Sequence, residues 1–215
     1  PLSPQLLSEA KRRLAQATSE VSASYISSEA HVELIFVALL ARGHLLLEGV
    51  PGVAKTTLAH SVAVVCGCPM KRVQFTPDLL PADVVGGGVY HPERQRCEVH
   101  KGPIFTNVLL ADELSRAPAK TQAALLEAMQ EKQVTLGDQT YRLERPFFVM
   151  ATQNPIDQEG TYPLPEAQQD RFMFNIYIGY PTEAEEVQIG LATTVDATPD
   201  LKTVMKGADI LRYQS

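Results

Sequence analysis

The chain has 215 residues, of which 45% are hydrophobic and 20% charged, and its formal net charge is -6. This composition is typical of a globular domain, and the negative charge argues against binding along a nucleic-acid backbone, although a local basic patch remains compatible with it. The longest apolar run, residues 34–41, is too short to cross a membrane. Because the N-terminal region also lacks the apolar core of a secretory signal, we expect a cytoplasmic protein without membrane insertion.

Two helices are predicted before the first strand. Ser3 and Pro4 form a helix start, and apolar residues follow at spacings of three and four as far as Ala17. The second helix is predicted over about residues 29–41 because its apolar side chains form one broad face. Gly43 is expected to end this helix in the left-handed conformation.

From residue 44 onwards, short apolar runs alternate with helical segments. Strands are predicted at residues 44–48, 71–75, 108–111, 147–151 and 174–178, with helices at 55–66, 120–131 and 183–191. Continuously apolar strands between helices predict an α/β fold with a five-stranded, mostly parallel sheet sandwiched by helices. Phosphate ligands of such folds bind at the carboxyl ends of the strands.

Two β-hairpins are predicted as insertions in this alternation. Residues 86–90 and 97–100 form the first around a charged tip, and residues 133–136 and 140–143 form the second around Gly137-Asp138-Gln139. Either hairpin alone could be an edge decoration. Two hairpins on one core favour a role in contacting a partner.

A glycine-bearing loop joins the first strand to the helix at 55–66. It consists of Gly49, Val50, Pro51, Gly52, Val53, Ala54, Lys55, Thr56 and Thr57. Backbone N–H groups at a helix start and a lysine charge together bind a triphosphate. The strict phosphate-loop signature has glycine where Ala54 stands, so a tight turn with an exposed lysine is the alternative.

Asp112 and Glu113 directly follow the strand predicted at residues 108–111, at the edge of the sheet where phosphates are expected. Asp112 could hold Mg²⁺ together with the Thr56 hydroxyl, and Glu113 could orient and deprotonate an attacking water. Such a pair alone is more often a solvated turn. After a phosphate loop it favours an ATPase whose cofactors are ATP and Mg²⁺.

Two further polar residues flank predicted strands, since Asn154 comes after the strand at 147–151 and Arg171 comes just before the strand at 174–178. Asn154 could hydrogen-bond the attacking water or the γ-phosphate, with turn capping as the alternative. Arg171 could reach the γ-phosphate of a neighbouring subunit, with an ion pair to Asp170 or Glu166 as the alternative. An arginine in that role typically accelerates phosphoryl transfer roughly 10³- to 10⁵-fold.

These segments together resemble the ATPase core of MoxR-family AAA+ proteins, a branch with an insert in helix 2. The similar segments are residues 43–56, 74–83, 110–118, 122–131, 151–155 and 159–172. Alanine before the lysine is usual in that family. The resemblance implies Walker A at residues 49–56, Walker B at Asp112 and Glu113, sensor 1 at Asn154 and an arginine finger at Arg171.

The resemblance also implies an organisation. Residues 1–182 would form a P-loop NTPase core. Residues 183–215 would be the incomplete start of a helical lid. Most of that lid, including its sensor 2 arginine, would be absent from this chain. The hairpins would be the helix-2 and pre-sensor-1 inserts of a hexameric ring. Residues 26–28 depart from the Val-Gly-Gln that usually lies by the adenine, and Arg116 acts either near a subunit interface or in a local ion pair.

Three functions are compatible with these segments. The first is an ATP-driven, chaperone-like remodeller or maturation factor for protein clients, for which the family implies a von Willebrand factor A domain protein as partner. The second is a nucleotide-gated assembly scaffold with slow hydrolysis. The third is a nucleic-acid motor, supported only by Arg94 and Arg96 and opposed by the flanking Glu93 and Glu98. Glu113 and Arg171 favour the first.

Overall fold

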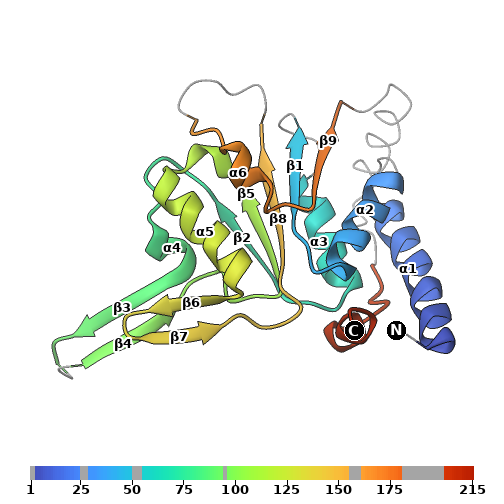
Figure 1. The fold of residues 1–215 in the computed structure, drawn as a ribbon, viewed down its shortest axis with the longest axis horizontal. Helices are drawn as coiled ribbons and strands as arrows, with labels where there is room; N and C mark the ends of the chain where they lie inside the picture. The colour runs from blue at the N-terminus through green and yellow to red at the C-terminus, as the bar shows by residue number, and fades with distance from the viewer. Residues whose placement is uncertain (1–2, 25–28, 50–54, 94–95, 155–160, 181–200) are drawn as a thin grey trace.

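A parallel sheet of five strands, in the order β2-β5-β8-β1-β9, forms the centre of the molecule (Figure 1). The structure is a computed structural model that describes residues 3–24, 29–49, 55–93, 96–154, 161–180 and 201–215. The strands of the sheet are β1 (Leu45–Gly49), β2 (Met70–Gln74), β5 (Val108–Asp112), β8 (Phe148–Gln153) and β9 (Phe174–Ile178). Every pairing between them is parallel, which confirms the predicted α/β fold.

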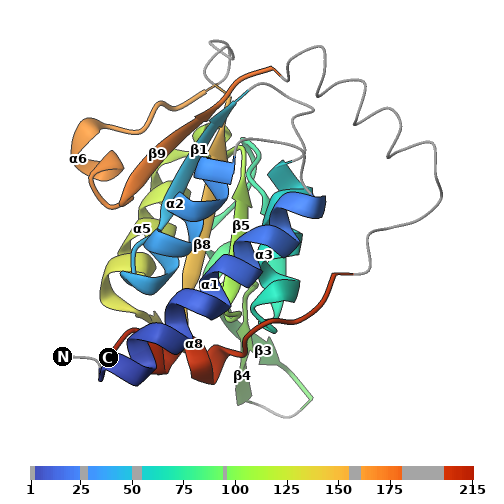
Figure 2. The same ribbon diagram turned by 90° about the vertical axis from the view of Figure 1, so that its right-hand side faces the viewer.

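Helices cover both faces of this sheet because successive strand side chains point to opposite sides. Leu45 and Leu47 pack in one apolar cluster with the helices of the first face, and Leu46 packs in a second cluster with the helix of the other face. The first face carries α1 (Pro4–Ser24), α2 (Glu29–Leu40) and α3 (Lys55–Val65), and the second carries α5 (Ala119–Glu131). Figure 2 shows these layers, with α1 nearest the viewer and α5 behind the strands.

The turn after α2 differs from the sequence prediction. Arg42, with φ 60°, has the left-handed conformation that was expected of Gly43. A Cβ atom on Gly43 would lie only 2.7 Å from the Cβ of Met173, the residue before β9. Met173 also donates its N–H to the carbonyl of His44 at 2.8 Å. Glycine is therefore needed for the close approach of two chain segments, not for the backbone angle.

Two antiparallel hairpins extend from the core, as predicted. They are formed by β3 (Gly86–His91) with β4 (Arg96–Lys101), and by β6 (Gln133–Leu136) with β7 (Gln139–Arg142). The turn of the second hairpin has two residues instead of the predicted three, because Gln139 already pairs with Leu136. Gly137, with φ 66°, supplies the left-handed angle that this tight turn needs.

The two hairpins lie side by side at the lower end of the sheet in Figure 1, away from the tips of the strand arrows. The ammonium of Lys101, the last residue of β4, lies 5.2 Å from the ring centroid of Tyr141 in β7 and 5.0 Å from that of Phe105. These two rings also meet edge to face at 6.4 Å. Cation–π contacts of this kind stabilise the pairing, so one cluster fastens both hairpins together.

Several short helices were not predicted, because three to seven residues are too few to show a helical period. They are α4 (Pro81–Val85), a 3₁₀ turn (Leu114–Arg116), α6 (Glu166–Gln169) and α8 (Gly207–Tyr213). The helix predicted at residues 183–191 lies outside the described residues. The segment that carries α8 packs on α1, where Tyr213 donates to Glu9 at 3.1 Å and Arg13 donates to the carbonyl of Val204 at 2.6 Å. None of the helices that the structure describes is long and apolar enough to span a membrane.

Candidate active site

The carboxyl ends of the five strands meet at one edge of the sheet, the upper edge in Figure 1. There β1 ends at Gly49 and β5 ends at Asp112, with β8 between them. Helix α3 begins at Lys55, and Thr56 and Thr57 are exposed in its first turn. The other predicted loop residues, Val50, Pro51, Gly52, Val53 and Ala54, lie outside the described residues, as do residues 26–28.

Lys55 is held against the end of the first strand. Its ammonium donates to the carbonyl of Gly49 at 2.8 Å. Burial lowers the pKa of this amine, whereas the carboxylates of Asp112 and Glu113 raise it. The structure therefore brings the lysine and the acidic pair into one electrostatic environment, where a positive charge is available to phosphate oxygens.

Asp112 is buried, with 9% of its surface exposed, and both of its carboxylate oxygens are bonded. Oδ1 accepts a hydrogen bond from the Thr152 hydroxyl at 2.6 Å. Oδ2 accepts two from the Arg72 guanidinium, from Nη2 at 2.6 Å and from Nε at 3.1 Å. Sequence reasoning missed Thr152 and Arg72, because each reaches Asp112 from a neighbouring strand. The carboxylate is thus fixed in orientation before any ligand arrives.

Glu113 has an unusual backbone and a charged partner. Its φ of 57° is left-handed, which is uncommon for a residue with a side chain and is often found at functional sites. Its backbone N–H donates to the Thr152 hydroxyl at 2.9 Å, so one hydroxyl holds both acidic residues. Its Oε2 lies 3.1 Å from Nε of Arg116, which is the local ion pair left open for that arginine.

The oxygen donors here suit magnesium. A carboxylate at Asp112 and a hydroxyl at Thr56 are hard ligands, and Mg²⁺ commonly keeps several waters besides one or two protein oxygens. The part of the chain that the structure describes has no cluster of three metal-ligating side chains, so softer metals have no comparable site there. Its two described thiols, Cys66 and Cys68, are free, and burial raises the pKa of both, that of Cys68 to about 11.

A second polar group lies along the same edge, on β8, β1 and β9. Glu48 accepts hydrogen bonds from Gln153 and from Asn175, the latter at 2.9 Å. Asn154 directly follows Gln153 at the end of β8, which places it beside the strand that carries Asp112. Neither Glu48 nor Asn175 was predicted as a site residue, although each occupies a polar position in an apolar strand.

Arg171 is not brought to this edge. It precedes β9, whose amino end lies beside His44 at the start of β1. Its exposed guanidinium donates to Gln130 at 3.2 Å and to the carbonyl of Ala167 at 3.3 Å. Among the described residues it forms no ion pair, so the pairing with Asp170 or Glu166 that the sequence left open is not present.

Comparison with known proteins finds a matching family model and related proteins. Residues 44–174 match the family model described as "ATPase family associated with various cellular activities (AAA)". The chain is 49% identical over 201 residues to Chaperone MoxR1 of Mycobacterium tuberculosis, an alignment that covers 94% of this chain and 53% of that protein. It is 32% identical over 187 residues to Protein MoxR of Methylorubrum extorquens, covering 83% of this chain and 53% of that one.

A solved structure agrees with the sequence relatives. It is a crystal structure of a protein from Cytophaga hutchinsonii, with a TM-score of 0.82 and 41% identity. The match covers 97% of this chain and 66% of that one. The chain spans about half the length of the curated relatives it matches. It belongs to the AAA family of ATPases, in the MoxR branch.

Proposed function

We propose that this chain is the ATP-binding and ATP-hydrolysing core of a MoxR-type protein that acts as a chaperone-like remodeller or maturation factor for protein clients. One observation carries the proposal: Lys55, bonded to the carbonyl of Gly49 at the end of β1, lies at the same carboxyl edge of the sheet as Asp112 and Glu113. A phosphate-binding cation beside a fixed carboxylate and a candidate base is the arrangement that phosphoryl transfer to water needs.

Each site residue has a separate role in nucleotide binding or hydrolysis in this proposal. Lys55 and the backbone N–H groups of the loop from Gly49 to Thr57 bind the phosphates. Asp112 and Thr56 hold Mg²⁺, which supplies charge neutralisation when bound. Glu113 takes the proton of the attacking water, and the Asn154 amide orients that water.

Arg171 acts in trans in this proposal. Its place near the amino end of β9 is remote from the nucleotide edge of its own subunit, and its guanidinium is exposed. A ring, most simply a hexamer, would bring it to a neighbour's γ-phosphate. Residues 1–182 then serve as the core, and residues 183–215 begin a lid.

The client is a protein in this proposal. A relative named as a chaperone supports this choice, and family resemblance suggests a von Willebrand factor A domain protein. The ion pair between Glu113 and Arg116 favours a second candidate, a scaffold with slow hydrolysis, because the guanidinium engages the carboxylate that would act as the base. The side chains of Arg94 and Arg96 lie outside the described residues and add nothing to a nucleic-acid motor.

ATP hydrolysis measured against protein concentration tests the proposal. Specific activity should rise with concentration, since a trans-acting arginine requires assembly. Glu113→Gln should bind ATP and hydrolyse it about 10²- to 10⁴-fold more slowly, because the general base is lost. Glu127→Gln, at an exposed position on α5, is the matched control and should behave as wild type. Normal turnover by Glu113→Gln would exclude Glu113 as the base.

A further inference from the structure

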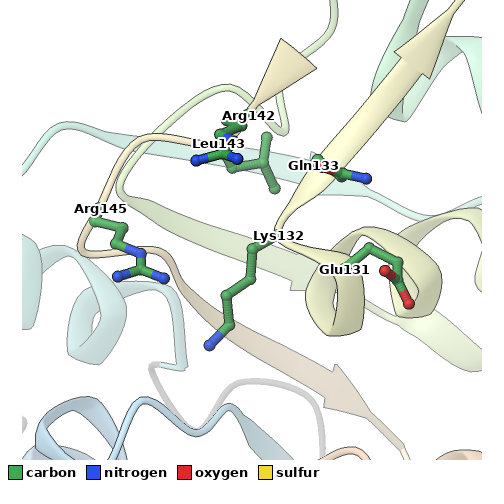
Figure 3. A pocket seen from close by; sticks show the side chains of 6 residues that line it. All are labelled: Glu131, Lys132, Gln133, Arg142, Leu143 and Arg145. Atoms are coloured by element: carbon green, nitrogen blue, oxygen red, sulfur yellow. The ribbon is translucent and has the colours of Figure 1, made fainter. Parts of the chain in front are cut away.

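A hollow of about 540 Å³ lies at the base of the β6–β7 hairpin, a volume within the usual range of ligand sites. It is lined by Glu131, Lys132, Gln133, Arg142, Leu143 and Arg145 (Figure 3). A smaller hollow shares Lys132, Leu143 and Arg145 and reaches Arg42 and Gln214 beside α8. The combined surface is formed by the end of α5, both hairpin strands and the segment leading into β8. It lies at the amino end of the sheet, opposite the candidate active site.

Backbone hydrogen bonds at the end of α5 and at the base of the hairpin shape this hollow. Lys132, with φ 55°, ends α5 by donating its N–H to Ala128 at 2.9 Å, and the chain turns there into β6. Its carbonyl accepts a hydrogen bond from the N–H of Leu143 at 3.0 Å, which closes the base of the hairpin. Leu143 is buried, with 5% exposure, and gives the hollow an apolar floor. The basic side chains therefore stand on a frame that does not need a ligand to form.

The charges in the hollow are unbalanced. Lys132, Arg142 and Arg145 face a single carboxylate, that of Glu131, and Figure 3 shows Glu131 apart from them on α5. In Figure 3, the side chains of Lys132 and Arg145 both extend toward the bottom of the view, and Arg142 lies beside Leu143. Within the part of the chain that the structure describes, none of the three cations has an ion pair or a side-chain hydrogen bond.

This lack of partners separates these cations from other basic residues of the same chain. Arg72 pairs with Asp112, Arg116 with Glu113, and Arg212 with Glu9. The partial negative charge at the end of α5 compensates part of the charge of Lys132, but it does not extend to two arginines on the hairpin and its exit. On a chain with a net charge of -6, three uncompensated cations in one hollow indicate an external anion.

We propose that this hollow binds an acidic segment of a partner protein through its aspartate and glutamate carboxylates. Guanidinium groups bind carboxylates with paired hydrogen bonds, and the two exposed arginines can each bind one carboxylate in this way. A nucleic acid fits less well, because the exposed carboxylates of Glu131, Asp138 and Glu144 interrupt the basic surface along and around the hairpin. The site goes beyond the proposed ATPase, since neither ATP binding nor hydrolysis requires it.

Fluorescence anisotropy with a fluorescein-labelled octaglutamate peptide, at low ionic strength and without nucleotide, tests the site. Arg142→Gln/Arg145→Gln should weaken binding about tenfold, the loss of two exposed charge contacts. Lys11→Gln/Arg12→Gln removes the same charge from exposed positions on α1 and should leave binding unchanged. Equal weakening in both variants, no weakening in the first, or no binding by the wild-type chain would overturn the proposal.

A second variant and two competitors sharpen the result. Lys132→Asn keeps a residue that tolerates the left-handed backbone, so it should fold normally and also weaken peptide binding. Inorganic tripolyphosphate and single-stranded oligothymidylate should displace the labelled peptide less effectively than unlabelled octaglutamate does. More effective displacement by either would overturn the assignment to an acidic peptide. ATP affinity, measured on the same variants, should stay at the wild-type value and so reports separately on the proposed ATPase.

Discussion

The two ends of the sheet differ in whether their charged side chains form ion pairs within the chain. At the carboxyl end, the carboxylates of Asp112 and Glu113 are each paired with an arginine of the same chain. At the amino end, Lys132, Arg142 and Arg145 have no such partners among the described residues. The pairing of Asp112 with Arg72 holds that carboxylate in one orientation, which suits a residue that positions a metal ion. Charges left unpaired favour binding something from outside.

The largest expected effect concerns Arg171, which lies near the amino end of the sheet and is proposed to act at the carboxyl end of a neighbouring subunit. Arg171→Ala should lower the ATPase rate by about 10³-fold or more, because a guanidinium that stabilises the transferring phosphoryl group is lost. Mixing Arg171→Ala with Glu113→Gln subunits should restore activity, since some interfaces then combine an intact arginine with an intact base. Arg12→Ala, at an exposed position on α1, should retain the wild-type rate. No recovery in assembled mixtures would count against action in trans.

At the carboxyl end itself, Lys55→Ala should lower ATP affinity by about 100-fold, below detection in most titrations, because the phosphates lose a charged donor. Isothermal titration calorimetry measures this directly. Lys11→Ala removes an equal charge from an exposed position and should bind ATP normally. Affinity retained by Lys55→Ala would remove the lysine from the phosphate site.

At the amino end, the buried imidazole of His44 should make the protein sensitive to acid. Burial lowers its pKa from 6.5 to about 4, and the charge of Lys132 adds to this lowering. Between pH 6.5 and about 4, the unfolded chain therefore binds a proton at His44 that the folded protein does not bind. The free energy of unfolding should fall as the pH falls from about 6.5 to 4, by up to about 3 kcal/mol from this residue.

Urea unfolding across this pH range, with His44→Asn as the comparison, isolates that contribution. Asparagine keeps an acceptor for the hydrogen bond that Nδ1 of His44 receives from the N–H of Val149 at 3.1 Å, but it does not titrate. The variant should lose less stability on acidification than the wild type. Identical pH profiles would show that His44 is not the responsible group.

The smallest effect concerns the pairing of Asp112. Arg72→Gln should lower the Mg²⁺ concentration for half-maximal ATPase activity about threefold, because a half-exposed competing cation is removed from Oδ2. Arg72→Lys keeps the charge and should leave the Mg²⁺ dependence close to wild type. An unchanged or higher Mg²⁺ requirement in Arg72→Gln would mean that the arginine serves only to orient the carboxylate.

The sequence predicted elements well and contacts between them poorly. All five strands were predicted to within two residues at either end, because continuous apolar runs between helices have few other interpretations. Arg72 and Thr152 were missed because their contact with Asp112 depends on strand order and register, with Ala111 opposite both Val73 and Ala151. The basic hollow was missed for the same reason, since Lys132, Arg142 and Arg145 meet only when the hairpin closes. The roles given to Lys55, Glu113, Asn154 and Arg171 remain predictions.

The Thr152 hydroxyl has a mechanical consequence. It donates to the side chain of Asp112 and accepts from the backbone of Glu113, so these neighbours are joined through a third residue as well as through the chain. A ligand that moved the Asp112 carboxylate would therefore also act on the peptide group of Glu113 through this hydroxyl.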